Sequence, residues 1–152
     1  MKILNFGSLN IDHVYDMEHF VKAKETVSAM NYHLQIGGKG LNQSVALARA
    51  KMKVYHAGKI GADGTMLCAY LEENGVDTSY IRESGKASGH AIIQVVDGEN
   101  CIIVYGGANR DIDAAMIEDV LSDFEQGDLL LLQNEISNVD VLIQKAHAKG
   151  MK

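Results

Sequence analysis

Residues 37–50 read Gly37-Gly38-Lys39-Gly40-Leu41-Asn42-Gln43-Ser44-Val45-Ala46-Leu47-Ala48-Arg49-Ala50. A glycine-rich turn is followed by an Ala- and Leu-rich segment whose apolar residues recur at helical spacing, which predicts a helix that begins near Gly40. The first backbone N–H groups of a helix have no partner within it, so we expect the turn to offer them to an anion or to sugar oxygens. A tight strand-to-helix turn with no further role is the alternative. The stretch is not a P-loop, because no Ser or Thr follows Lys39.

Around this turn, apolar strand-like segments alternate with predicted helices. The strands are expected at 2–7, 53–60, 78–82 and 129–133, and the helices at 40–50, 63–74, 113–124 and 137–149. Asp63, Asp113 and Ser137 stand where the N-caps of the last three helices are expected. This alternation is typical of an α/β fold with a parallel sheet that is covered on both faces.

A second group of segments shows the alternation of half-exposed strands instead. These segments lie at about 11–20, 26–36, 89–96 and 100–105. Asp97-Gly98 between the last two is a strong signal for a hairpin turn. The sequence therefore predicts a small sheet apart from the parallel one.

Composition excludes several classes of protein. The chain has 152 residues, 47% of them hydrophobic, and a formal net charge of −6, which argues against a nucleic-acid partner. No apolar stretch approaches the ~20 residues of a membrane helix, and no signal-peptide pattern follows Met1, so we expect no membrane partner and a cytoplasmic protein. Cys68 and Cys101 are expected to be buried free thiols, and no His or Cys spacing indicates a metal site.

Three polar side chains stand at predicted strand ends, where α/β folds bind their ligands. Asn10 and Asp12 follow the first strand at a spacing of i, i+2, which places both on one side of an extended chain. Glu135 follows Gln133-Asn134 after the 129–133 strand. Each also has an ordinary interpretation, since Asn and Asp are frequent turn residues and Glu135 could be a solvated loop charge.

These weak signals occur in a familiar order. Together they resemble the N-terminal half of the ribokinase-like (phosphofructokinase B type) carbohydrate kinases, and the resemblance covers essentially the whole chain. The segments that carry it are Gly7-Ser8-Leu9-Asn10-Ile11-Asp12, Gly37-Gly38-Lys39-Gly40-Leu41-Asn42-Gln43, Gly61-Ala62-Asp63, Gly106-Gly107-Ala108-Asn109 and Gln133-Asn134-Glu135.

The resemblance implies a fold and a binding site. The fold is a truncated Rossmann-like domain over 1–152, with a small β-sheet lid whose strands lie within about 11–36 and 89–105, and lids of this family often pair into a homodimer. The substrate is a sugar, with ribose as the first candidate. Asn10 and Asp12 would bind its hydroxyls, Gly38, Lys39 and Asn42 would line the floor of the site, and Glu135 would close it.

The resemblance also shows what the chain lacks. The family carries its catalytic Gly-Ala-Gly-Asp string, its ATP site and the Asn/Glu motif that places Mg²⁺ in its second half, and none of these occurs here. We therefore expect no catalytic residue and no cofactor in this chain, ATP and Mg²⁺ in a full-length family member, and a sugar-binding half that is inactive alone. The alternative is a non-catalytic sugar-binding or lid-mediated dimerisation module from a degenerate kinase gene.

Overall fold

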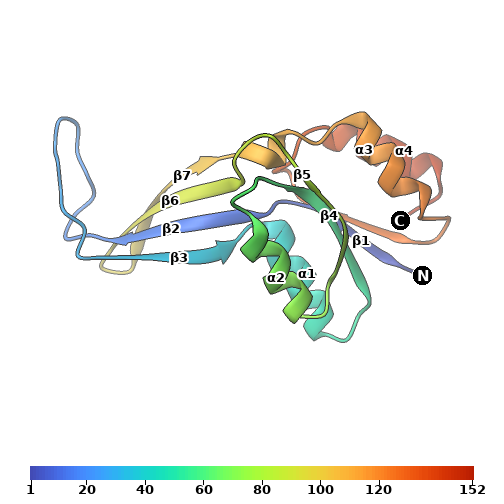
Figure 1. Cartoon of the computed structure of the whole chain (residues 1–152), viewed down its shortest axis with the longest axis horizontal. Helices are drawn as coiled ribbons and strands as arrows, with labels where there is room; N and C mark the ends of the chain where they lie inside the picture. Colours follow the sequence, from blue (N-terminus) through green and yellow to red (C-terminus); the bar gives the residue numbers. More distant parts are fainter.

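The computed structural model describes residues 1–152 and contains two four-stranded sheets (Figure 1). The first sheet has the order β5-β4-β1-β8, and all of its strands are parallel. Its strands are β1 (Ile3–Phe6), β4 (Val54–Ile60), β5 (Asp77–Glu83) and β8 (Leu129–Leu132). This sheet is the centre of what we call the body.

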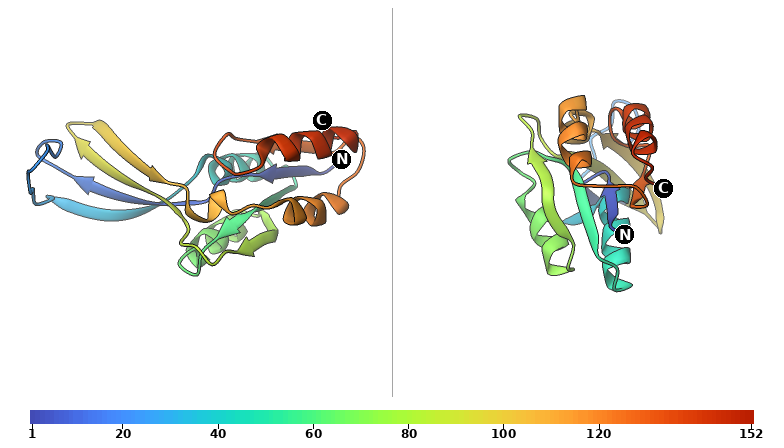
Figure 2. Two further views of the ribbon diagram at one scale, coloured as in Figure 1. Left: turned by 90° about the horizontal axis from the view of Figure 1, so that it is seen from above. Right: turned by 90° about the vertical axis from the view of Figure 1, so that its right-hand side faces the viewer.

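Helices cover both faces of the parallel sheet, as Figure 2 shows from two sides. The helices are α1 (Lys39–Arg49), α2 (Thr65–Glu73), α3 (Ala114–Ser122) and α4 (Val139–Ala148). Alternate side chains of β1 enter two separate cores. Leu4 and Phe6 pack with residues of α3 and α4, whereas Ile3 packs with residues of α1 and α2. No helix in the structure is both long and apolar enough to cross a membrane.

The second sheet projects from one end of the body, and we call it the arm (Figure 1). It has the order β3-β2-β6-β7, with β2 and β6 parallel and the outer pairs antiparallel. Its strands are β2 (Asn10–Asp16), β3 (Asn31–Gly37), β6 (Gly89–Val96) and β7 (Glu99–Tyr105). The separate small sheet is therefore present.

Some details of the arm differ from the sequence-based predictions. The hairpin at Asp97-Gly98 is confirmed, since both residues have positive φ and Val96 pairs with Glu99. The strand expected at 26–36 begins only at Asn31, because pairing with β2 stops where Asp16 faces Asn31. The expectation of two buried thiols is wrong, since Cys101 on β7 is exposed and Cys68 on α2 is only partly buried.

Of the three predicted helix caps, one is confirmed. Asp113 accepts a hydrogen bond from the backbone N of Met116 at 2.8 Å. Asp63 does not cap α2, because its carboxylate accepts the backbone N–H of Ser88 instead, at 2.9 Å. Ser137 does not cap α4, because its hydroxyl donates to the Ile112 carbonyl at 2.8 Å.

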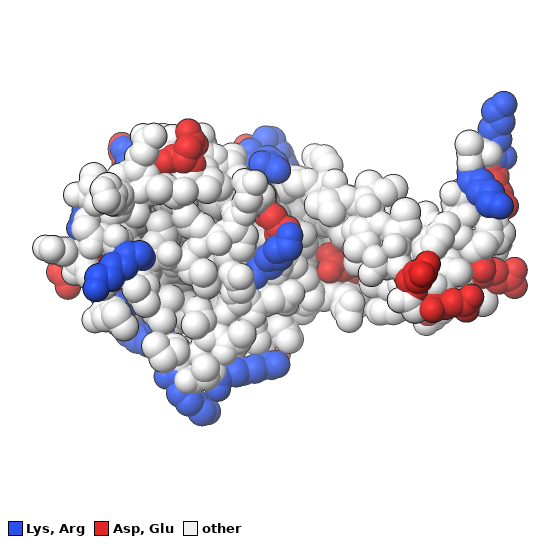
Figure 3. Space-filling view, turned by 180° about the vertical axis from the view of Figure 1, so that it is seen from behind, with Lys and Arg blue, Asp and Glu red and all other residues white.

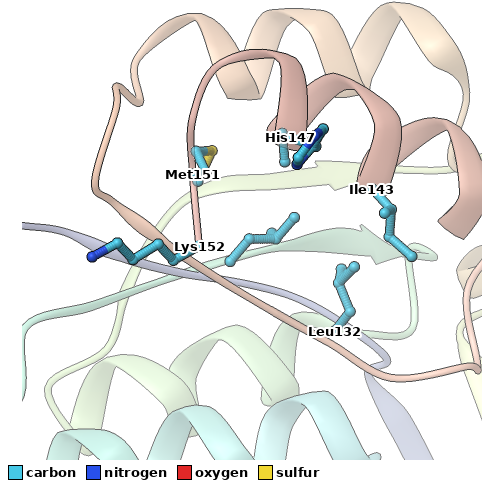
Figure 4. A pocket seen from close by; sticks show the side chains of 7 residues that line it. Leu132, Ile143, His147, Met151 and Lys152 are labelled. Atoms are coloured by element: carbon cyan, nitrogen blue, oxygen red, sulfur yellow. The ribbon is translucent and has the colours of Figure 1, made fainter.

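An apolar cavity of about 210 Å³ lies beside β8 at the edge of the parallel sheet. Side chains of β8, α4 and the C-terminal residues border it, as Figure 4 shows. Its lining comprises Leu130, Leu132, Ile143, Ala146, His147, Met151 and Lys152. The body therefore exposes an apolar surface at this edge.

Candidate functional site

The glycine turn lies where body and arm meet, and the N–H groups of Gly40, Leu41 and Asn42 have partners within the protein. The N–H groups of Gly40 and Leu41 donate to the side chain and carbonyl of Ser8, at 3.2 and 3.0 Å. The N–H of Asn42 donates to the Gly38 carbonyl at 3.0 Å. The expectation of free N–H groups is therefore wrong at Gly40 and Leu41, whose acceptors belong to the chain that leaves β1, and Asn42 donates within the start of α1.

The close approach of α1 to the end of β1 requires a glycine at position 40. A Cβ atom at Gly40 would lie 2.4 Å from the backbone N of Ser8 and 2.6 Å from the carbonyl carbon of Gly7. Both are backbone atoms, which cannot move aside as the end of a side chain can. Gly40 therefore sets how near the first turn of α1 comes to the strand end that carries the candidate site.

Glu135 is bound by two groups of this junction. Its carboxylate accepts a hydrogen bond from the Ser8 hydroxyl at 2.6 Å and pairs with the Lys39 ammonium at 2.5 Å. Partial burial alone would raise the pKa of Glu135, but hydrogen bonds from Lys39 and Ser8 outweigh it and hold the pKa below its ordinary value. Glu135 is therefore a carboxylate whose charge is balanced by Lys39.

Asn10 lies at the start of β2 between two glycines, Gly37 of β3 and Gly89 of β6. A Cβ atom at Gly89 would lie 2.4 Å from Asn10 Oδ1. The absence of a side chain at Gly89 therefore leaves room for the Asn10 amide. Gly37 does the same for Asp12, whose carboxylate occupies the space that a Cβ atom at Gly37 would fill.

Asn109 fixes the orientation of the Asn10 amide. Asn109 Oδ1 accepts the N–H of Leu9 at 3.0 Å, so its Nδ2 must be the donor to Asn10 Oδ1, at 2.8 Å. The remaining polar group of Asn10 is then its Nδ2, a hydrogen-bond donor. Asn109 itself is buried.

Asp12 is a carboxylate without a donor from the protein. Burial, and to a smaller extent the charge of Glu135, raise the pKa of Asp12, while His13 opposes the rise. No hydrogen bond contributes to this pKa. A half-buried carboxylate of this kind gains stability when a ligand supplies hydrogen-bond donors.

Several of these side chains line a polar cavity of about 200 Å³. Of the residues predicted from the sequence, Asn10 and Glu135 line it, and Lys39 adjoins it through its pairing with Glu135. Asp12, Gly38 and Asn42 are not in its lining. The full lining is Ser8, Asn10, Val104, Gly106, Asn109, Arg110, Asn134 and Glu135.

Sequence reasoning assigned no role to Ser8, Asn109 or Arg110. Ser8 and Asn109 lie within the segments that carry the family resemblance, and this is the one signal that pointed to them. Arg110 directly follows such a segment. Their positions in the cavity depend on β7 and the following short helix η1 (Gly107–Arg110) meeting the end of β1, which is a property of the fold.

A network of buried polar side chains connects β1, α1 and β4 beside the glycine turn. The Asn5 side-chain amide donates to the Gly40 carbonyl at 2.7 Å and to the Ser44 hydroxyl at 2.8 Å. Ser44 in turn bonds to Nδ1 of His56 at 2.8 Å, and Nε2 of His56 lies 3.3 Å from the Gly7 carbonyl. Burial lowers the pKa of His56 to about 4, with the Gly7 carbonyl opposing the shift, so His56 is neutral at pH 7.

The site holds neither a cluster of metal-ligating side chains nor a phosphate site built on the N–H groups of Gly40, Leu41 and Asn42. The structure contains no group of three or more His, Cys, Asp or Glu side chains that could hold a metal ion. The N–H groups of Gly40, Leu41 and Asn42, which could have held phosphate oxygens, already have partners. We therefore derive no step through ATP or Mg²⁺ from this site.

Comparison with known proteins agrees with the architecture. The profile described as "pfkB family carbohydrate kinase" matches residues 1–149. Ribokinase of Haemophilus influenzae is 39% identical over 96% of this chain and 50% of its own length, and ribokinase of Bacillus subtilis is 38% identical over 93% and 50%. The chain thus spans about half the length of the curated relatives it matches.

Solved structures give the same result. A Cryptococcus neoformans ribokinase in complex with ADP superposes with a TM-score of 0.77 at 36% identity, covering 94% of this chain and 44% of that one. An Arabidopsis thaliana ribokinase complexed with ribose and ATP gives a TM-score of 0.81 at 30% identity, covering 98% and 50%. The predicted α/β fold class is confirmed, and the chain belongs to the pfkB family of carbohydrate kinases, within which it matches half of a ribokinase-like kinase.

Proposed function

We propose that this chain is the sugar-binding half of a ribokinase-like kinase, which transfers a phosphoryl group from ATP to a sugar hydroxyl, and that alone it binds the sugar without phosphorylating it. Ribose is the first candidate for the sugar. Relatives that match nearly the whole of this chain are named ribokinase, and a similar ribokinase structure was solved in complex with ribose and ATP. The alternative of a non-catalytic module from a degenerate gene is not favoured by these matches. The cytoplasmic location stays a prediction.

Two unpartnered groups on one face of β2 carry this proposal. Asn10 has a free donor, its Nδ2, since Asn109 occupies its oxygen, and Asp12 offers acceptor oxygens that no protein group binds. A sugar hydroxyl both donates and accepts, so neighbouring hydroxyls can satisfy a donor and an acceptor held side by side. Each ligand hydroxyl that is buried without a partner would cost ~1–3 kcal/mol of binding free energy. The donor of Asn10 and the acceptor of Asp12 would therefore favour ligands whose hydroxyls match them.

The neighbouring residues would orient the sugar. Glu135 keeps its charge because Lys39 and Ser8 hold its pKa low, so it accepts hydrogen bonds from hydroxyls. The Lys39 side chain is 71% exposed and can turn from Glu135 to a ligand oxygen without leaving a buried charge. Gly38 and Asn42 lie with Lys39 at the N-terminal end of α1, and we propose that they form the floor of the sugar site.

Replacing Asp12 by Asn tests the proposal. We expect the wild-type chain to bind ribose in a calorimetric titration and Asp12→Asn to weaken binding by about ten-fold or more, because a hydroxyl loses its charged acceptor. Binding by the wild type should also weaken as the pH falls through the raised pKa of Asp12, since the protonated carboxyl group is a poorer acceptor.

Asp16→Asn is the matched control for this experiment. Asp16 lies on the same strand as Asp12, is bonded to Asn31 at 3.1 Å, and is distant from the cavity lining. We expect its substitution to leave ribose affinity unchanged. Equal affinities of Asp12→Asn and the wild type would contradict the assignment of Asp12.

We also propose that the chain forms a homodimer through the arm. Leu34, His13, Ile92 and Ile103 stand side by side across its four strands, on the face opposite Asp12. We call the three apolar members, Leu34, Ile92 and Ile103, the apolar row, and Ile103 is 61% exposed. On the side of the molecule shown in Figure 3, the charged side chains of the arm gather mainly towards its outer end. Apolar surface of this kind favours association with a second copy.

Ile103→Lys is expected to convert the dimer to a monomer in size-exclusion chromatography with light scattering, because it places a charge in the apolar row without disturbing a buried side chain. Ile143→Lys is the control. Ile143 on α4 is 52% exposed and borders the cavity beside β8, so it tests the other exposed apolar surface. A monomeric wild type, or a dimer that only Ile143→Lys disrupts, would exclude the arm as the interface.

A further inference from the structure

Arg110 is a cation in the wall of the polar cavity that has no carboxylate partner. The seven ion pairs of the structure do not include it, and the contact of its guanidinium group is a long one, 3.5 Å from the Ile136 carbonyl. Its side chain folds against Gly106, where a Cβ atom would lie 2.5 Å from Arg110 Cγ. The glycine before η1 therefore gives the arginine its place beside the cavity.

The other groups around the cavity leave this positive charge unbalanced. Glu135 is the only acidic residue in the lining, and Lys39 already neutralises it at 2.5 Å. The remaining polar lining residues are amides and a hydroxyl, those of Asn10, Asn109, Asn134 and Ser8. The cavity thus has a net positive end at Arg110, and most of the five guanidinium N–H donors are unused.

We propose that Arg110 forms a subsite for an anionic group carried by the sugar, either a phosphate ester or a carboxylate. The planar guanidinium fork matches two oxygens of such a group and distinguishes it from a neutral hydroxymethyl group. This inference rests on the proposed function, and it specifies the substrate class as an anionic sugar.

A single molecule can contact both parts of this site. Arg110, Asn10 and Glu135 line the same cavity of about 200 Å³. A sugar held by Asn10 through its hydroxyls therefore places a substituent within reach of Arg110. Charge-assisted hydrogen bonds to an anionic substituent are about twice as strong as neutral ones, so the substituent would decide which sugar is preferred.

The test compares ribose, ribose 5-phosphate and ribonate in calorimetric titrations of the whole chain, its Arg110→Gln and Arg110→Lys variants, and Arg82→Gln. Arg82 lies on β5, pairs with Asp119 at 3.2 Å and is absent from the cavity lining, so it is the matched control. We expect at least one anionic sugar to bind about ten-fold more tightly than ribose to the wild type and to Arg82→Gln. Arg110→Gln should abolish this preference, and Arg110→Lys should keep part of it.

Several outcomes would overturn the subsite. Equal affinities for ribose and both anionic sugars would do so, as would a preference that survives in Arg110→Gln. An added titration with ADP separates a second source of phosphate: if Arg110→Gln weakens ADP binding and leaves the sugar preference intact, Arg110 belongs to the nucleotide. Ribose binding without an anionic preference leaves the proposed function standing, whereas no binding of any sugar contradicts both.

Discussion

Gly40→Ala is expected to destabilise the protein by about 3 kcal/mol or more, or to prevent folding altogether. The added methyl group would lie 2.4 Å from the Ser8 backbone N and 2.6 Å from the Gly7 carbonyl carbon. Relief requires α1 to move away from the end of β1, which breaks the hydrogen bonds that Gly40 and Leu41 make to Ser8. Because Ser8 also holds Glu135, the candidate site would lose its geometry with the fold.

Gly85→Ala provides the comparison. A Cβ atom at Gly85 meets nothing within 4 Å, and its φ is not positive, so alanine fits there. We expect this variant to be unchanged or stabilised by a few tenths of a kcal/mol, since alanine has less backbone freedom to lose on folding. Urea denaturation followed by circular dichroism measures both. A Gly40→Ala variant as stable as Gly85→Ala would mean that α1 does not pack against the strand end as described.

The second large effect is a loss of stability in mild acid that depends on His56. The unfolded chain titrates this imidazole near 6.5, whereas burial holds the pKa of the folded protein at about 4. Below pH 6.5 the unfolded state therefore binds a proton that the folded state does not. The stability is complete above pH 6.5 and falls progressively as the pH drops towards 4, by about 3 kcal/mol in total.

The surroundings of His56 make this assignment specific. Its ring contacts the Ser44 hydroxyl and the Gly7 carbonyl, both uncharged, so no neighbouring carboxylate offsets the cost of protonation. Carboxylates with lowered pKa values, such as Glu135 and Asp128, act in the same direction but at lower pH.

Urea denaturation at several pH values between 7 and 4 measures the loss, with His56→Gln and the exposed His33→Gln as the pair of variants. His33→Gln should keep the slope of stability against pH, and His56→Gln should remove most of it. If His56→Gln does not fold, the imidazole signals of the wild type in NMR decide the matter, because His56 should not titrate above pH 5. Titration of His56 near 6.5 in the folded protein would refute the prediction.

The sequence alone predicted those parts of the fold that depend on contacts between residues close together in the chain. The Asp97-Gly98 hairpin turns at two neighbouring residues of types that favour such a turn, and both adopt positive φ. The Asp113 cap forms because its partner, Met116, lies three residues away. The alternation of strands and helices is likewise confirmed, since each element is marked by its own period of apolar residues.

Contacts between distant segments account for the errors. Asp63 and Asp113 both stand in front of a helix, but the Asp63 carboxylate finds the N–H of Ser88, which is 25 residues away. The glycine turn was expected to offer free N–H groups, and Ser8, 32 residues earlier, occupies the one at Gly40. No local pattern reveals that a strand end and a helix start will meet. Only the family resemblance linked the strand end to the helix start, because it rests on motifs from distant parts of the chain taken together.

The candidate site shows the same limit. Asn10, Asp12 and Glu135 were identified because strand ends in α/β folds attract ligands, and the structure places Asn10 and Glu135 in one cavity. Asn109 was missed as the residue that orients Asn10, because its partner lies 99 positions away. Arg110 was missed because no local pattern indicates that an exposed arginine after a turn lines a cavity.

The placement of the two cysteines has a practical consequence for the study of motion between body and arm. Cys101 is exposed on β7 of the arm, and Cys68 lies on α2 of the body, partly accessible. Spin labels attached to both would report the distance between body and arm without any engineered cysteine. The distribution of distances between the labels, with and without sugar, tests whether the arm changes its position relative to the body when a ligand binds.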